Sequence, residues 1–138
     1  MYQRILVPVD LAHLESLSKA LDTAADLANQ YNADLCYVGV TGTAPSNIAP
    51  SPEAFSKKLE AFAKQQQAKH GRPSQARSYQ ASDPVASVDD LVLKAVDECH
   101  CDLLVMATHD PKKLDAILPS NGSKIAKHTQ SSVFLVRG

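Results

Sequence analysis

The alternation of short apolar runs with longer amphipathic segments is the feature that most limits the folds open to this 138-residue chain. The runs are rich in branched side chains and shorter than typical helices, so they predict buried strands. A weaker run at 76–81 has the pattern of a strand near the edge of a sheet. The complete set of expected strands is 5–10, 35–40, 76–81, 102–107 and 133–136.

The segments between these strands have helical periodicity. Helices are expected at 14–31, 51–70, 83–99 and 120–129. Ser51-Pro52-Glu53 is a good helix start, since serine caps, proline fits the first turn and glutamate favours the positive end of the helix dipole. Asn32 and Gly71 suit helix ends. The polar residues 64–70 are expected to fray.

This strand–helix alternation predicts an α/β fold with a parallel, doubly wound sheet and helices on both faces. A chain of this length is expected to form a single domain spanning 1–138. Ligands of such sheets bind at the carboxyl ends of the strands, often against a helix N-terminus. Met106–Pro111 leaves one predicted strand, and Ser120 opens the next predicted helix. The two segments therefore contain the parts of a phosphate-binding corner.

The charge balance argues against several classes of partner. Fourteen basic residues face fifteen acidic ones without a basic stripe, so nucleic-acid binding is not expected. Membrane insertion is not expected either, because no apolar run approaches the roughly 20 residues that span a bilayer. The N-terminus lacks the pattern of a signal peptide. Cys36, Cys99 and Cys101 form an odd set without disulfide spacing, which indicates a reducing, cytoplasmic location.

Motifs for catalysis and metal binding are absent from the sequence. Cys99-His100-Cys101 offers three ligand types without a second cluster, so no metal site is predicted. The chain has no nucleophile elbow and no Walker A sequence. Leu11 and Ala12 follow Asp10, where a response regulator would need a second acid. We expect no catalytic residues, and at most slow ATP hydrolysis or autophosphorylation.

Four pieces of the chain, in order, resemble the universal stress protein family. The run 5–10 is similar to its first strand, and Ser82-Asp83-Pro84 is similar to its Gly-Asp-Pro. Residues 101–106 are similar to its ADLIVMG strand, and His128 with 131–136 is similar to its RHAPCPVLVV ending. The resemblance implies a five-stranded parallel sheet of order 3-2-1-4-5. It also implies a homodimer through the last strand, at Val133, Phe134, Leu135 and Val136.

Many family members bind ATP through the motif G-x2-G-x9-G-[ST]. In this chain the three glycines fall on Ala107, Asp110 and Pro119, with eight intervening residues before the third, and only Ser120 matches. The pattern also resembles a bacterial subgroup with ASHRP…LLGSN that binds adenine nucleotides. Asp110 replaces its arginine and Pro119 replaces its glycine. Asp110 would repel phosphates unless a divalent cation bridges them, and Pro119 removes one N–H donor.

The resemblance implies a site for ATP or AMP, with or without Mg²⁺, at the ends of the first and fourth strands. Its residues would be Pro8, Val9, Asp10, Val40, Met106, Ala107, His109, Asp110, Pro119, Ser120 and Asn121. Five of these residues also have a plainer interpretation. Val40 and Met106 suit a core, Asp10 and Ser120 suit helix caps, and His109 suits a loop.

Two functions follow from these interpretations. The first is a small cytoplasmic stress-response regulator that binds an adenine nucleotide and signals to an unknown protein partner. The alternative is a family member that does not bind nucleotide and acts as a dimeric protein-interaction module. Loss of all three motif glycines favours the alternative, and the remaining strand-end pattern with His109 and Ser120-Asn121 favours the first.

Overall fold

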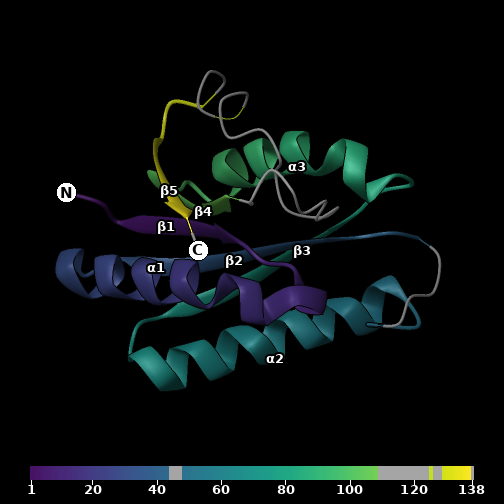
Figure 1. The fold of residues 1–138 in the computed structure, drawn as a ribbon, viewed down its shortest axis with the longest axis horizontal. Coiled ribbons are helices and arrows are strands. Elements are labelled where there is room, and N and C mark those ends of the chain that lie inside the picture. The colour runs from purple at the N-terminus through teal and green to yellow at the C-terminus, as the bar shows by residue number, and fades with distance from the viewer. Residues whose placement is uncertain (44–47, 109–124, 126–128, 138) are drawn as a thin grey trace.

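A computed structural model of the chain describes residues 1–43, 48–108, 125 and 129–137. These residues form one five-stranded sheet of order β3-β2-β1-β4-β5, with every neighbouring pair parallel (Figure 1). The predicted α/β fold and strand order are confirmed. The strands are β1 (Arg4–Pro8), β2 (Asp34–Thr41), β3 (Ser74–Gln80), β4 (Leu103–Thr108) and β5 (Ser132–Arg137). The helices are η1 (Leu11–Leu17, a 3₁₀ helix), α1 (Ser18–Tyr31), α2 (Pro52–His70) and α3 (Pro84–Glu98).

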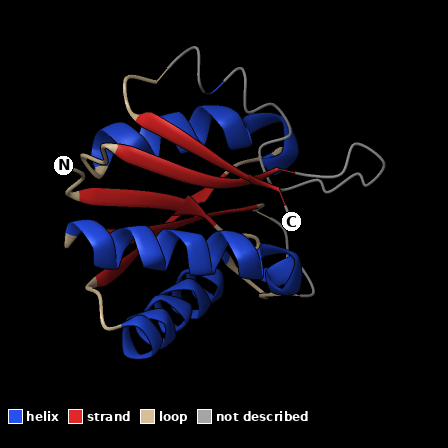
Figure 2. Cartoon of the chain, turned by 60° about the vertical axis from the view of Figure 1, so that its left-hand side comes forward, coloured by secondary structure: helices blue, strands red, loops and turns tan. Residues whose placement is uncertain are grey.

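Helices cover the sheet on both faces, with α1 and α2 on one side and α3 on the other (Figures 1 and 2). Side chains of successive strand residues point to opposite faces. Ile5 and Val7 of β1 therefore join the core under α1 and α2, whereas Leu6 joins the core under α3. Because both faces of the central strands are buried, these strands are apolar along their length instead of alternating.

The first predicted helix, 14–31, is wrong in its first part, because the structure has a 3₁₀ helix there and the α-helix starts later. Residues 11–17 form η1, in which His13 lies outside helical geometry (φ −134°, ψ 44°), and α1 begins only at Ser18. The cause is local. The Asp10 side chain accepts a hydrogen bond from the Ala12 N–H at 3.0 Å, which stabilises a tight turn in place of an α-helical one. Asn32 ends α1 in the left-handed conformation (φ 53°), as expected.

The second helix has the predicted start and extends to the predicted end. The Ser51 hydroxyl accepts from the Ala54 N–H at 3.2 Å, which confirms the cap. Residues 64–70, where fraying is expected, are helical, and α2 continues to His70. Gly71 stops it at φ 72°, where its N–H donates to the Gln67 carbonyl at 2.8 Å. The Gln67 side chain also accepts from the Ser74 N–H at 3.1 Å, which ties the last turn of α2 to β3.

The weak strand lies at the sheet edge as predicted, but it covers Ser74–Gln80 instead of 76–81. It begins earlier because pairing with β2 starts at Leu35↔Ser74. The predicted helix 120–129 lies mostly outside the described residues. Within the described part, Ile125 is buried in the α3-side core. No helix in the described ranges has both the length and the apolar composition needed to cross a bilayer.

Candidate functional site

The sheet opens between β1 and β4, where the strand order reverses. These two strands pair only at Ile5↔Leu103 and Leu6↔Leu104. On its other side β1 remains paired with β2 up to Pro8↔Val38, and β4 remains paired with β5 as far as its last residue. The carboxyl-terminal halves of β1 and β4 are therefore unpaired toward each other. In doubly wound folds this switch point is where ligands bind.

Pro8 explains why the pairing stops. The Val9 N–H donates to the Val38 carbonyl at 2.7 Å, so the backbone of Val9 faces β2. Consecutive residues of a strand direct their backbone groups to opposite sides, and Pro8 therefore faces β4. Proline has no N–H to donate. From the sequence alone, Pro8 is expected to stop strand pairing near it, because it cannot donate a backbone hydrogen bond. Pairing does end before Pro8 on the β4 side, but it continues through Pro8 on the β2 side.

Asp10 lies just beyond the end of β1 and is 2% exposed. One carboxylate oxygen accepts from the Ala12 N–H, as described above, and the other lies 2.6 Å from Nδ1 of His13. Because an ionised carboxylate only accepts, the imidazole N–H donates in this pair. The capping role considered for Asp10 is thus present. A carboxylate has about four acceptor positions, so these contacts do not exhaust it.

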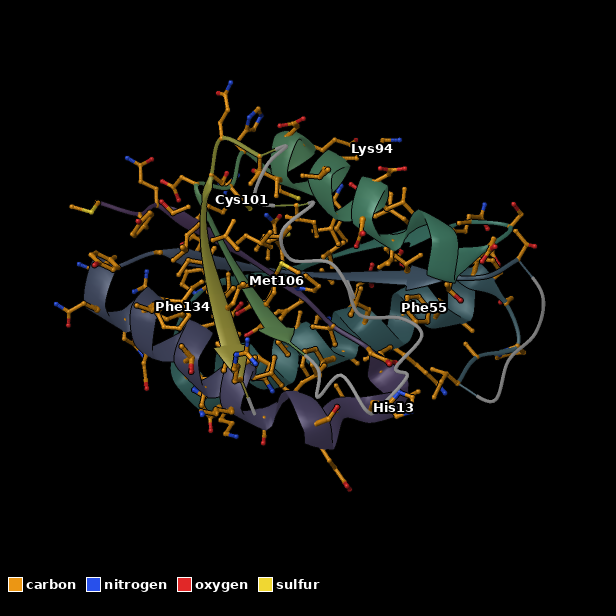
Figure 3. All side chains as sticks on the ribbon, turned by 45° about the horizontal axis from the view of Figure 1, so that its top comes forward. His13, Phe55, Lys94, Cys101, Met106 and Phe134 are labelled. Carbon is orange, nitrogen blue, oxygen red and sulfur yellow. The ribbon has the colours of Figure 1, made fainter. Side chains whose placement is uncertain are left out.

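His13 is a polar residue of this region that the sequence reasoning did not single out. Its side chain is half exposed, and it lies on η1 beside the carboxyl end of β1 (Figure 3). A carboxylate fixes the orientation of its ring through Nδ1, as in sites where a histidine binds anions or transfers protons. The available signal was the Asp-x-x-His spacing directly after a strand, because an aspartate that caps a turn reaches residues two and three positions on.

The apolar candidates divide between the two faces of the sheet. Val40 and Met106 are buried in the core under α3, and Met106 lies in the interior in Figure 3. Their core interpretation is therefore present in the structure. Val9 and Ala107 are buried on the opposite face, under α1 and α2. Val40 lies two residues beyond Val38, the partner of Pro8, near the end of β2. Strand-end residues from both faces thus border the opening.

The remaining predicted site residues lie outside the described part of the chain. They are His109, Asp110, Pro119, Ser120 and Asn121. Their roles therefore remain predictions. Among the residues that the structure describes, no group of three or more His, Cys, Asp or Glu side chains has the arrangement of a metal site.

The sheet order, the end of β1–β4 pairing and the Asp10 turn define an α/β domain of the doubly wound class, in which the carboxyl ends of β1 and β4 lie at the switch point. The family model described as "Universal stress protein family" matches residues 1–137. The chain belongs to the universal stress protein family.

The relatives agree with this assignment. Universal stress protein G of Salmonella typhimurium is 25% identical over 99% of this chain and 100% of that protein. A solved universal stress protein from Archaeoglobus fulgidus superimposes with a TM-score of 0.68 at 17% identity, covering 98% of each chain. A protein of the same family from Burkholderia pseudomallei gives 0.67 at 23% identity, covering 98% of this chain and 96% of that one.

Some of the similar structures contain a bound ligand. The universal stress protein from Archaeoglobus fulgidus in complex with dAMP superimposes with a TM-score of 0.66 at 16% identity, covering 97% of each chain. At this level of identity the likeness shows a common fold.

Proposed function

We propose that this chain is a small cytoplasmic stress-response regulator that binds ATP or AMP in the crevice between β1 and β4. The observation that carries the proposal is the early end of β1–β4 pairing at Leu6↔Leu104. Beyond that pair, β1 and β4 are not paired with each other, although each remains paired with its other neighbour. In this proposal residues 1–138 act as one domain, and nucleotide occupancy changes the surface offered to a regulatory protein.

The described residues supply the adenine and ribose part of this site. Pro8, Val9 and Asp10 would line one wall and Val40 the end of the neighbouring strand, all at the same edge of the sheet. Asp10 retains acceptor capacity for a ligand hydroxyl or amino group. Met106 and Ala107 would border the opposite wall.

The phosphates would lie toward the segment that follows β4. His109, Ala107 and the N–H groups after Ser120 would bind them, as expected from the sequence motif. Asp110 and Pro119 would weaken this part of the site, and Mg²⁺ between Asp110 and the phosphates would reverse the repulsion. Support for an adenine nucleotide comes from similar folds described in complex with cAMP and with dAMP.

Isothermal titration of nucleotide-stripped protein with ATP and with AMP, each with and without Mg²⁺, tests the proposal. Micromolar binding is expected. Asp10→Asn should weaken it about tenfold or more, since a hydrogen bond to a charged group contributes about 1.5–3 kcal/mol. Asp26→Asn makes the same chemical change on the exposed surface of α1 and should leave binding unchanged. Absence of binding heat and of thermal stabilisation by either nucleotide would refute the proposal.

We further propose a homodimer through β5. This strand is at the end of the sheet order, so its outer backbone groups face away from β4. Phe134 and Leu135 are 44% and 45% exposed, and Figure 3 shows Phe134 on this edge strand. An apolar edge strand favours pairing with another chain. A two-fold axis would pair β5 of one chain with β5 of the other, so that the outer backbone groups of both strands form hydrogen bonds.

The same edge favours the alternative function, a dimeric interaction module without nucleotide. Exposed apolar residues on β5 would support protein contacts even if the crevice were empty. Purified protein that releases no adenine-absorbing compound on heating, and that remains a dimer, would favour this alternative.

A further inference from the structure

Three buried cysteines from separate parts of the chain meet on the α3 side of the sheet. Cys36 belongs to β2, Cys99 directly follows α3 and Cys101 precedes β4. The sulfur atoms of Cys36 and Cys99 lie 3.3 Å apart, although the residues are separated by 63 positions in the chain. The three residues are 0%, 3% and 7% exposed, respectively. Only the tertiary fold brings these thiols together.

The turn after α3 fixes Cys99 against β2. The Cys101 N–H donates to the Val96 carbonyl at 3.0 Å and the His100 N–H donates to the Asp97 carbonyl at 3.3 Å, the paired bonds of a Schellman helix end. The Arg4 guanidinium donates to the Cys99 carbonyl at 2.7 Å. The central residue of the turn, His100, has φ 54°. This left-handed conformation is strained for residues other than glycine.

We propose that Cys36 and Cys99 form an oxidation site, at which a hydroperoxide converts the two thiols to a disulfide that joins β2 to the end of α3. The sulfur atoms must approach from 3.3 Å to about 2.05 Å, a small movement for side chains already in contact. The bond would hold the turn at 99–101 onto the sheet. Nothing in this site depends on nucleotide binding.

The chemistry balances with the peroxide as the only oxidant. The thiolate of Cys99 attacks one peroxide oxygen, the O–O bond breaks, and the sulfur becomes a sulfenic acid while hydroxide leaves. The Cys36 thiol then attacks the sulfenic sulfur, the S–S bond forms and the oxygen leaves as water. Two thiols and one hydrogen peroxide thus give one disulfide and two waters.

Burial makes this oxidation slow in the closed fold. Burial and the contact with Cys36 raise the pKa of Cys99 to about 12, so little thiolate is present at neutral pH. A hydrogen bond with Cys101 and burial also raise the pKa of Cys36. Opening of the strained turn at His100 would expose Cys99. A cavity of about 640 Å³, lined in part by His100 and Cys101, brings solvent to this turn.

The test treats the reduced, full-length protein with hydrogen peroxide in the presence of a chelator, followed by alkylation in denaturant and mass spectrometry. We expect a product that has lost two hydrogen atoms, with a peptide linking Cys36 to Cys99. Its thermal unfolding midpoint should be higher than that of the reduced protein, and thiol reductant should restore the original mass and midpoint.

Single alanine variants distinguish the Cys36–Cys99 disulfide from disulfides that would involve Cys101. Cys101→Ala keeps the contacting pair and should still form the disulfide. Cys36→Ala and Cys99→Ala should each prevent it, and two variants guard against one failing to fold. Three thiols that remain reduced, conversion of Cys99 to sulfinic acid in place of a disulfide, or a bond that maps to Cys101 would each overturn the proposal.

Discussion

Asp10 and His13 are held together by a 2.6 Å contact between Oδ2 and Nδ1, and this contact shapes the chain as it leaves β1. The aspartate is buried, whereas the histidine side chain is half exposed. Together with the Ala12 N–H, the pair replaces the first turns of the expected α-helix with η1. The turn also borders the opening between β1 and β4.

Removal of the Asp10 carboxylate should destabilise the protein. In Asp10→Ala, the Ala12 N–H and the His13 ring lose their acceptor, and we expect a loss of about 1–3 kcal/mol in the free energy of unfolding. Asp10→Asn keeps a neutral acceptor for the Ala12 N–H and should cost less. Urea unfolding of the three proteins measures the difference. Equal stability of wild type and Asp10→Ala would mean that the carboxylate does not hold this turn.

Two glycines should respond to alanine for different reasons. A Cβ at Gly39 would lie 2.9 Å from Phe55 Cζ and 3.2 Å from Leu59 Cδ2, so Gly39→Ala overpacks the contact between β2 and α2. We expect a cost of about 1–3 kcal/mol. Gly71→Ala meets no neighbouring atom but must adopt φ 72°, at a cost of roughly 1–2 kcal/mol.

A second substitution distinguishes these two causes. Shortening the neighbour in Gly39→Ala/Phe55→Leu should recover part of the lost stability, whereas the same Phe55→Leu change added to Gly71→Ala should only lower stability further. Urea midpoints of the four variants provide the comparison. If Phe55→Leu recovers no stability in the Gly39→Ala protein, the packing explanation is wrong.

Alkaline pH should destabilise the fold through Tyr37. Burial raises the pKa of this tyrosine from 10.0 to about 12. Because the unfolded chain ionises first, stability is complete below pH 10 and falls as pH rises toward 12, at about 1.4 kcal/mol per pH unit. Tyr37→Phe keeps the edge-on ring contact with Phe62 and should remove this part of the slope.

The measurement for Tyr37 is the urea midpoint at a series of pH values on both sides of pH 10. Tyr31→Phe removes a phenol from a partly exposed ring and serves as the control. If Tyr37→Phe and wild type have parallel pH dependence, the ionisation of Tyr37 does not contribute.

Charge at position 110 should set the affinity for ATP. We expect Asp110→Arg to bind ATP without Mg²⁺ on the order of tenfold more tightly or better, because it replaces repulsion of about 1 kcal/mol with attraction. Asp110→Asn removes only the repulsion and should be intermediate. If Mg²⁺ bridges Asp110 and the phosphates, its benefit should disappear in both variants. Identical titrations for all three proteins would place Asp110 away from the phosphates.

Charge on β5 should break the proposed dimer. Leu135→Lys places a cation on the apolar edge strand and should halve the mass measured by light scattering at micromolar concentration. Glu60→Lys changes charge on the exposed surface of α2 and should leave the mass unchanged. A wild-type monomer, or a Leu135→Lys protein that remains dimeric, would exclude this interface.

Much of the fold was predictable because burial leaves a pattern in the sequence. The apolar run around Leu103 predicted a strand, and Ser51-Pro52 predicted a helix start. The order 3-2-1-4-5 came from the resemblance to the family. Pro8 predicted an interruption in pairing, but the strand affected depends on which neighbour its backbone faces. That information exists only once β1 is placed between β2 and β4.

The sequence by itself determined the alternation of strands and helices and the family, because periodicity and short motifs are local properties of the chain. The tertiary structure decided three further features. It placed the opening beside Pro8, paired Asp10 with His13 and brought Cys36 to Cys99. Each of these features depends on how segments that are distant in the chain pack against one another. Local sequence patterns do not specify that packing.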